Sequence, residues 1–353
     1  MVHDFSPILF QIYGDLAIRW YGFSYLIGFL SAYMMIRWLA VRQKQGLTPK
    51  MIGDFVAYGA IGVLVGGRLG YCIFYSPDLF LKFKSEFPFW GVFALNEGGM
   101  ASHGGMIGLV VACTLFAIKH GLSRLYLYDL VALVGPIGIF FGRIANFING
   151  ELVGRPAPAD FPLAVRFPTD IELWPTEAPS RLGGLSQVVD KIPGMSTENW
   201  LEWVDKYRTD PSAKDSLYSG LHKIIEAIQS GNSAAKEAIA PLLDPRHPSQ
   251  LYGALGEGLI LFLILFFLWR RPRRPGVIGC SFVVFYAIAR IIDEEFRMPD
   301  VGIGFQLFGL TRGQWLSIGM LLIGIVFLFL WGRREALPIP GWRRGQNVKI
   351  HRR

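Results

Sequence analysis

A group of polar residues directly follows an apolar stretch in the middle of the chain. After LVALVGPIGIFF, the sequence GRIANFINGELVGR contains Arg143, Asn146, Asn149 and Glu151. Arg143 and Asn146 are three residues apart and would share one face of a helix, which Gly150 is expected to end. An Arg–Glu pair could simply lock two helices together, but such pairs seldom stabilise an apolar region. We therefore expect a ligand site at this helix end.

A second set of polar residues is spaced by about one helical turn. In FYAIARIIDEEFR, Tyr286, Arg290 and Glu294 lie four residues apart and would line one stripe of a helix. Glu295 and Arg297 fit a set of side chains that reach back to the membrane interface, whereas Arg290 and Glu294 lie deeper. Because a phenol, a guanidinium and a carboxylate are poor lipid-facing groups, we expect the stripe to face a protein cavity.

Other polar residues interrupt further apolar stretches. His103 lies in GGMASHGG, where glycines let a backbone or a ligand approach closely, although a single membrane histidine is more often a packing residue. Arg68, in GGRLGY, would pair with an acid or touch lipid headgroups. Tyr21, in WYGFSY, could also be an interfacial aromatic residue. In RHPSQLYGALGEG, Gln250 and Glu257 are seven residues apart and share a helix face.

Arginine recurs in these sets, and its chemistry indicates the ligand. The guanidinium fork donates two parallel hydrogen bonds to a phosphate and keeps its charge when partly desolvated. Cys72, Cys113 and Cys280 have no metal-site spacing and are interpreted as small buried hydrophobic residues. The sequence contains neither a metal cluster nor a P-loop. It therefore favours a phosphate-bearing lipid over a nucleotide as ligand.

Membrane-crossing helices are the elements that would position these residues. Apolar residues make up 52% of the chain and the mean hydropathy is +0.36, which is unusual for a soluble domain. A crossing needs about 20 mostly apolar residues. The stretches that qualify are 16–36, 52–75, 100–118, 126–149, 249–269, 276–296 and 313–332. The expected fold class is an all-α polytopic membrane protein with seven transmembrane helices, the first of which is retained because no cleavage site precedes it.

Positive charge is distributed unevenly between the connecting segments. Lys and Arg are concentrated in 37–50, 119–125, 270–274 and the C-terminal tail, whereas the other side has Lys82 and Lys84 in one short loop and none in 298–311. With seven crossings the basic segments share one side, which predicts an N-terminus outside and a C-terminus inside. The net charge of +8 is therefore a topology signal and does not indicate nucleic-acid binding.

A long polar insertion interrupts the crossings. Residues 156–245 are Pro-rich at first and too long for a turn. Helical spacing begins at about 197, with Asp215 as the expected N-cap of a second helix and 234–243 as a third. The expected parts of the chain are 1–155 with four helices, the outer insertion at 156–245, 246–334 with three helices, and a basic cytoplasmic tail at 335–353.

At GRIANFINGELVGR the chain resembles the bacterial prolipoprotein diacylglyceryl transferases, whose signature is GRxANFxNxExxG. The HGG that contains His103, the RHPSQLY segment and the Tyr–Arg–Glu stripe resemble the other sequence blocks of this family, in the same order. The resemblance covers nearly the whole chain except about 156–240. The chain departs from the family at Gly253, where an acid is common, and in the length of the insertion, so no role is implied for either.

This resemblance implies an activity. The enzyme would transfer the sn-1,2-diacylglyceryl group of phosphatidylglycerol to the lipobox cysteine thiol of a prolipoprotein, forming a thioether and releasing glycerol 1-phosphate. Its partners would be phosphatidylglycerol, the lipobox segment of the prolipoprotein signal peptide and membrane lipid, without nucleic acid. The implied location is the inner (cytoplasmic) membrane, and the implied chemistry needs no cofactor or metal.

The resemblance also implies roles for individual residues. Arg143 and Arg290 would hold the phosphate and stabilise charge growing on the leaving group. His103 would be the base for the substrate thiol; the rival interpretation is arginine-assisted thiol activation, with His103 only orienting the lipid. The other implied substrate-binding residues are Tyr21, Asn146, Asn149, Glu151, Tyr286 and Glu294.

Two alternatives belong to other functional classes. A transporter or channel for an anionic solute would favour inverted repeats and broken helices, and the sequence shows no evident sign of either. A scaffold whose basic loops recruit anionic lipid would leave the polar residues within the apolar stretches unexplained.

Overall fold

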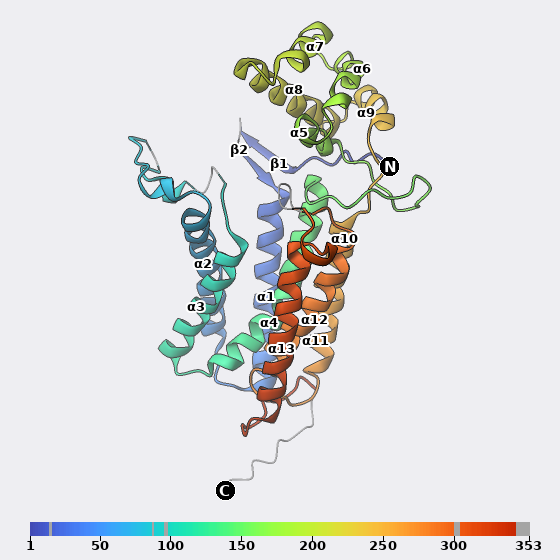
Figure 1. The fold of residues 1–353 in the computed structure, drawn as a ribbon. Helices are drawn as coiled ribbons and strands as arrows, with labels where there is room; N and C mark the ends of the chain where they lie inside the picture. Colours follow the sequence, from blue (N-terminus) through green and yellow to red (C-terminus); the bar gives the residue numbers. More distant parts are fainter. Residues whose placement is uncertain (14–15, 87, 95–97, 300–303, 344–353) are drawn as a thin grey trace. The chain divides into compact units, whose positions relative to one another are not determined.

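Long helices dominate the fold (Figure 1). The structure is a computed structural model, and it describes residues 1–353 except 14–15, 87, 95–97, 300–303 and 344–353. The long helices are α1 (Trp20–Gln43), α2 (Pro49–Phe74), α3 (Ser102–His120), α4 (Arg124–Asn149), α12 (Val277–Glu294) and α13 (Arg312–Arg333). A further helical segment joins α10 (Ser249–Gly253), a π-helix (Ala254–Ile260) and α11 (Leu261–Leu268). The predicted helical architecture is therefore confirmed in its main elements.

Six of these segments in the described residues are long and apolar enough to cross a membrane. The segment that does not qualify is α12, because its 18 residues include Arg290, Asp293 and Glu294. Large apolar side chains on the other helices are exposed, among them Leu26 at 64% and Leu322 at 60%. Such surfaces are suited to lipid and would be unfavourable in water.

The first predicted crossing begins too early in the sequence. Residues 16–19 form β2 (Leu16–Arg19), which pairs antiparallel with β1 (Ile8–Tyr13), and α1 starts only at Trp20. The physical reason is the pairing with β1, in which Phe10 lies opposite Ile18 and Gln11 opposite Ala17, and hydropathy does not report such pairing. The apolar character of this region made it resemble the start of a helix.

The described chain forms two compact units, each assembled from three stretches. Unit 1 contains Met1–Tyr25, Ile139–Gly258 and Ala289–Ser317, and unit 2 contains Leu26–Gly138, Leu259–Ile288 and Ile318–Arg353. Several long helices contribute one part to each unit. The seam and the ion cluster lie within unit 1, and the large apolar core lies within unit 2.

The core of unit 2 is an apolar cluster with one buried carboxylate at its edge. Phe55, Phe116, Leu130 and Leu265 are among its buried members. Asp129 of α4, 1% exposed, accepts hydrogen bonds from the backbone amides of Gly276 and Gly279, each at 2.7 Å. This carboxylate therefore caps the N-terminus of α12, whose first amide groups have no helical partner.

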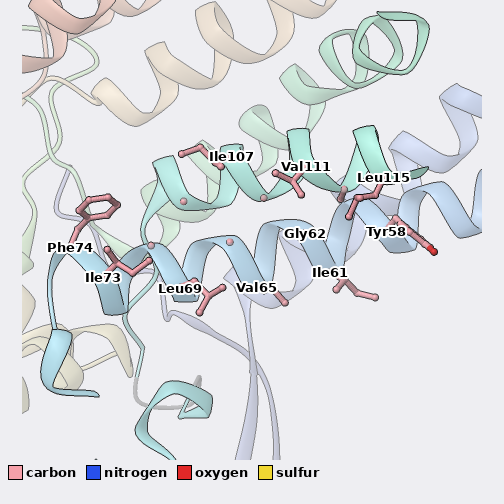
Figure 2. A pocket seen from close by; sticks show the side chains of 15 residues that line it. Tyr58, Ile61, Gly62, Val65, Leu69, Ile73, Phe74, Ile107, Val111 and Leu115 are labelled. Atoms are coloured by element: carbon pink, nitrogen blue, oxygen red, sulfur yellow. The ribbon is translucent and has the colours of Figure 1, made fainter. Parts of the chain in front are cut away.

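Within unit 2, α2 and α3 approach closely through glycines. A Cβ atom on Gly62 would lie 2.6 Å from the carbonyl oxygen of Gly108, and one on Gly66 would lie 2.8 Å from the Gly108 Cα. Small residues at such an interface let two membrane helices pack backbone to backbone. An apolar groove of about 510 Å³ runs along this pair, lined by side chains such as Ile61, Leu69 and Val111 (Figure 2).

The insertion, residues 156–245, is a helical body with its own core in unit 1. Its helices are α5 (Trp174–Glu177), α6 (Ser186–Val189), α7 (Thr197–Lys206), α8 (Pro211–Gln229) and α9 (Ser233–Ile239). Trp200 is fully buried and its indole nitrogen donates to the carbonyl of Leu182 at 3.0 Å. Helical structure in the insertion is thus as expected after residue 197, and the short helices before it were not predicted.

One predicted helix start in the insertion is wrong. The N-cap of α8 is Asp210, whose side chain accepts from the amide of Ser212 at 2.9 Å, and Asp215 lies inside the helix. Pro211 occupies the first helical position, where its fixed φ and missing N–H are favourable. The predicted third helix at 234–243 corresponds to α9, which Asn232 caps.

Three chain segments of unit 1 meet where α4 ends, α10 begins and α12 ends. We call this contact the seam; it comprises residues 154–156, 246–247 and 296–297. The amide of Arg155 donates to the Phe296 carbonyl at 2.7 Å, and the amide of His247 donates to the Arg155 carbonyl at 3.0 Å. Backbone hydrogen bonds therefore fix the spacing of three helices that carry polar residues.

A buried ion pair connects the seam to the insertion. Arg246, 8% exposed, pairs with Asp170 and donates to the Gly154 carbonyl at 3.1 Å. Burial raises the pKa of the Asp170 carboxyl, and the Arg246 guanidinium opposes that change.

The seam makes Gly154 intolerant of any side chain. A Cβ atom there would lie 2.8 Å from the Phe296 carbonyl oxygen and still closer to that of His247. We expect Gly154→Ala to lower the free energy of unfolding by about 1–3 kcal/mol, because two hydrogen-bonded backbone segments would have to separate. The measurement is the thermal unfolding midpoint in detergent. Gly183→Ala, which meets only open space, is the control, and equal midpoints for the two variants would contradict this expectation.

Candidate active site

A buried ion cluster occupies unit 1, where α4, the π-helix and α12 come together. Arg143 of α4 donates to Oε2 of Glu257 through Nη2 at 2.7 Å and through Nε at 3.2 Å. Arg290 of α12 donates to Oε1 of the same carboxylate through Nη1 at 3.2 Å. The Glu257 side chain is 1% exposed, and those of Arg143 and Arg290 are 13% and 15% exposed. One carboxylate therefore holds two guanidinium groups from different helices.

Asp293 adds a second carboxylate to this pair of arginines. Its Oδ2 lies 3.1 Å from Nη1 of Arg290 and 3.9 Å from Nη2 of Arg143. Like charges repel strongly where water is excluded, so two adjacent guanidinium groups require carboxylates between them. In the part of the chain that the structure describes, no group of His, Cys, Asp and Glu side chains could hold a metal ion. Each described acid of the cluster has an arginine beside it.

Glu294 extends the cluster along α12. It pairs with Arg290 one turn earlier, accepts from Nη1 of Arg297 at 3.0 Å and accepts from the Thr311 hydroxyl at 2.8 Å. Gly313 leaves the space that this carboxylate needs, since a Cβ there would lie 2.6 Å from Glu294 Oε1. Arg290 is therefore fixed from two sides, by Glu257 and by Glu294.

The π-helix places Glu257 in this cluster. A π-helical turn inserts an extra residue into a helix and is found frequently at functional sites. Glycines on either side allow α4 to lie close. A Cβ on Gly258 would be 2.7 Å from the Phe140 Cα, and one on Gly253 would be 3.0 Å from Nε of Arg143. The Arg143 side chain thus lies against Gly253 and reaches the carboxylate one turn further on.

Next to Arg143 on α4, a hydrogen-bonded network connects most of the remaining predicted residues. The Tyr21 hydroxyl donates to Oε2 of Glu151 at 2.7 Å and accepts from the side-chain amide of Asn146. Asn149 donates to Oε1 of Glu151 at 3.3 Å, and Gln250 donates to the Glu151 backbone carbonyl at 2.6 Å. Gly150 ends α4 with a φ of +68°, as predicted, so Glu151 can turn back towards the helix.

Two predicted site residues belong to unit 2. His103 is the second residue of α3 and is exposed, and Tyr286 stacks on Phe282 with ring centroids 5.5 Å apart. Their place beside the ion cluster of unit 1 stays a prediction.

Arg68 organises the segment that leads into α3. It donates to the backbone carbonyls of Gly91 at 2.7 Å, Val92 at 2.8 Å and Gly99 at 3.0 Å. Arg68 is 5% exposed, so headgroup contact, one of its two predicted roles, is wrong, and the partners that the structure shows are carbonyls and not an acid. Its burial instead fixes the loop from which His103 emerges.

Comparison with known proteins identifies the family. Residues 7–330 match the family described as prolipoprotein diacylglyceryl transferase. A phosphatidylglycerol–prolipoprotein diacylglyceryl transferase from Bdellovibrio bacteriovorus is 61% identical over 353 residues and is aligned over 100% of both chains. The chain belongs to the prolipoprotein diacylglyceryl transferase family. Proteins of the same name from Rhodospirillum rubrum and Rhodospirillum centenum are each 37% identical, over 96% and 92% of this chain and 96% and 90% of their own.

These alignments bear on the insertion. Because the Bdellovibrio bacteriovorus transferase is aligned over its full length, it has a counterpart of residues 156–245.

Several residues of the ion cluster were not among the predicted site residues. Arg297, which was predicted to reach the membrane interface, has a side chain that is 14% exposed and pairs with Glu294. Asp293 and Thr311 were not predicted, because neither repeats the four-residue spacing of the stripe. Glu257 was predicted only to share a face with Gln250. The available signal was an acid within the apolar segment GALGEGLILF, residues 253–262, since an ionisable group at membrane depth needs a partner.

The network around Glu151 gives a first test of the site. Tyr21→Phe removes the hydroxyl that donates to Glu151, so this carboxylate loses the group that orients it. We expect transferase activity to fall by about tenfold or more while the protein stays folded. Tyr25→Phe, on the next turn of α1 and 61% exposed, is the control. Wild-type activity in Tyr21→Phe would place this hydroxyl outside the active site.

Proposed function

We propose that the ion cluster around Arg143 and Arg290 binds the phosphate of phosphatidylglycerol. The chain is a transferase of the prolipoprotein diacylglyceryl transferase family, and it moves a diacylglyceryl group from phosphatidylglycerol to a prolipoprotein.

The convergence of the two arginines on Glu257 carries this proposal. Arg143 uses Nε and Nη2 for that carboxylate, and its Nη1 donates no hydrogen bond to any of the described residues. Because Arg143 is 13% exposed, this remaining amino group is accessible to a ligand. A guanidinium fixed on one edge and open on another is well suited to receive a phosphate oxygen.

The reaction places a growing negative charge at these arginines. The lipobox thiolate attacks the glycerol carbon that carries the phosphate, forming a carbon–sulfur bond and breaking the carbon–oxygen bond. The phosphodiester, with one negative charge, leaves as glycerol 1-phosphate, which acquires a second. Fixed cations near the leaving group stabilise this change more in the transition state than in the bound substrate, which is the condition for catalysis.

His103 is the proposed base for the thiol. The thiolate is the nucleophile, and a neutral imidazole can accept the thiol proton. The exposed position of His103 in the first turn of α3 supports access to a substrate. The rival role, orienting the lipid while an arginine activates the thiol, predicts a different pH response.

The hydrogen-bonded network is proposed to hold the substrates. Tyr21, Asn146 and Asn149 direct their polar groups at one another and at Glu151. Amides and hydroxyls of this kind can bind glycerol hydroxyls or the peptide backbone of the lipobox segment. Tyr286 and Glu294 complete the proposed set.

The proposed topology has seven crossings, with the N-terminus outside and the C-terminus inside the inner membrane. Counting α12 as a crossing is supported by its ionic partners. Arg290, Asp293 and Glu294 are paired within the protein, which reduces the cost of placing them at membrane depth. In this arrangement the insertion at 156–245 lies on the outer face and the tail at 335–353 is cytoplasmic.

The phosphate-binding role gives a direct prediction. With phosphatidylglycerol and a lipobox peptide in detergent, Arg143→Ala and Arg290→Ala should each lower turnover by about a hundredfold or more, because charge on the leaving group loses a fixed cation. Lysine at either position should restore only part of the loss, since it lacks the guanidinium fork. Arg208→Ala, an exposed arginine of the insertion, is the control. Full turnover in either alanine variant would refute the phosphate site.

The role of His103 is tested by its pH dependence. His103→Gln should lower turnover near neutral pH by about a hundredfold. If the lost function is proton removal, activity should recover as the pH approaches the ordinary thiol pKa of about 8.5, where the peptide ionises unaided. His222→Gln, 68% exposed in the insertion, is the control. Undiminished activity, or a loss that stays constant with pH, would rule out His103 as the base.

A further inference from the structure

Glu257 contacts both proposed phosphate-binding arginines, and it does so through separate oxygens. Oε2 accepts two hydrogen bonds from Arg143, and Oε1 accepts one from Arg290. Asp293 contacts both arginines through a single oxygen, at 3.1 and 3.9 Å. Glu294 pairs with Arg290 but not, among the contacts of the described residues, with Arg143.

We propose that Glu257 is a positioning residue that converts Arg143 and Arg290 into one phosphate-binding unit. This inference rests on the function proposed above. Glu257 is 1% exposed and both of its oxygens are occupied by guanidinium groups, so it acts on the lipid through the arginines and does not contact it.

Electrostatics explains why such a residue is needed. Two guanidinium groups on α4 and α12 repel each other, and the repulsion is large where water is excluded. A carboxylate between them replaces that repulsion with two attractions. The carboxylate also fixes the orientation of the Arg143 guanidinium, because Nε and Nη2 both bind Oε2 and Nη1 is on the side away from Glu257. A site that is already arranged before the lipid arrives has less reorganisation to complete in the transition state.

The local backbone is built to hold Glu257 in this place. The π-helix at Ala254–Ile260 sets the direction of its side chain. Gly258 lets this turn contact α4 at Phe140, and Gly253 leaves room for the Arg143 side chain, with only 3.0 Å between a Cβ and Nε. Three local features thus bring one carboxylate to two arginines.

Substitutions that separate charge from shape test this role. Glu257→Gln preserves the shape, but its amide nitrogen would face one of the guanidinium groups. Glu257→Asp preserves the charge but is one methylene shorter. For both variants, kcat and KM would be measured with phosphatidylglycerol and with a lipobox peptide, on protein whose thermal unfolding midpoint is known. Asp129→Asn, which removes a buried carboxylate in unit 2 that caps α12, is the matched control and should keep its turnover per folded molecule.

We expect Glu257→Gln to lower kcat/KM for phosphatidylglycerol by about ten- to a hundredfold, while KM for the peptide changes by less than about twofold. Glu257→Asp should retain more activity than Glu257→Gln, because charge matters more than shape in a positioning role. A purely structural role would give the opposite order, since glutamine fills the same volume.

Three results would overturn the inference. They are a Glu257→Gln variant at least as active as Glu257→Asp, equal losses for lipid and peptide, and failure of both variants to fold, which would assign Glu257 to structure. The arginine variants distinguish failure of the positioning role from failure of the proposed phosphate site. If Arg143→Ala and Arg290→Ala lose turnover while Glu257→Gln does not, only the positioning role is wrong.

Discussion

Two guanidinium groups repel each other, and an apolar protein interior strengthens that repulsion. Arg143 and Arg290 nevertheless converge in unit 1, because Glu257 lies between them and Asp293 and Glu294 complete the charge balance. Buried ionic networks of this kind contribute little net stability, since removing charges from water costs as much as their pairing returns. Stability alone does not explain their arrangement in this transferase, whereas the proposed phosphate site does.

The rest of unit 1 maintains the geometry of this cluster. The seam at 154–156, 246–247 and 296–297 joins the ends of the helices that carry Arg143, Glu257 and Arg290. Backbone hydrogen bonds in the seam hold these helix ends in fixed positions. Side-chain contacts alone would hold them less rigidly. The insertion is attached to the same seam through the ion pair of Arg246 and Asp170. The seam therefore links the insertion to the helices that carry the ion cluster.

The sequence predicted the long helices and many of the site residues, because apolar length and helical spacing are local signals. Arg290 and Glu294 were found by their four-residue spacing, and the structure places them in one cluster. Glu257 was harder to interpret, since its partners lie on other helices and are 114 and 33 residues away. The π-helix that directs it has no simple periodicity. Similarly, β2 was mistaken for the start of α1 because strand pairing is not visible in hydropathy.

The most direct measurement is an experimental structure of the His103→Gln variant with phosphatidylglycerol bound, in which turnover is slowed. The phosphate oxygens should lie within hydrogen-bond distance, about 2.7–3.2 Å, of guanidinium nitrogens from both Arg143 and Arg290. Glu257 should still contact both side chains. A headgroup bound away from either arginine, with the ion cluster unchanged and closed to it, would contradict the phosphate-binding site.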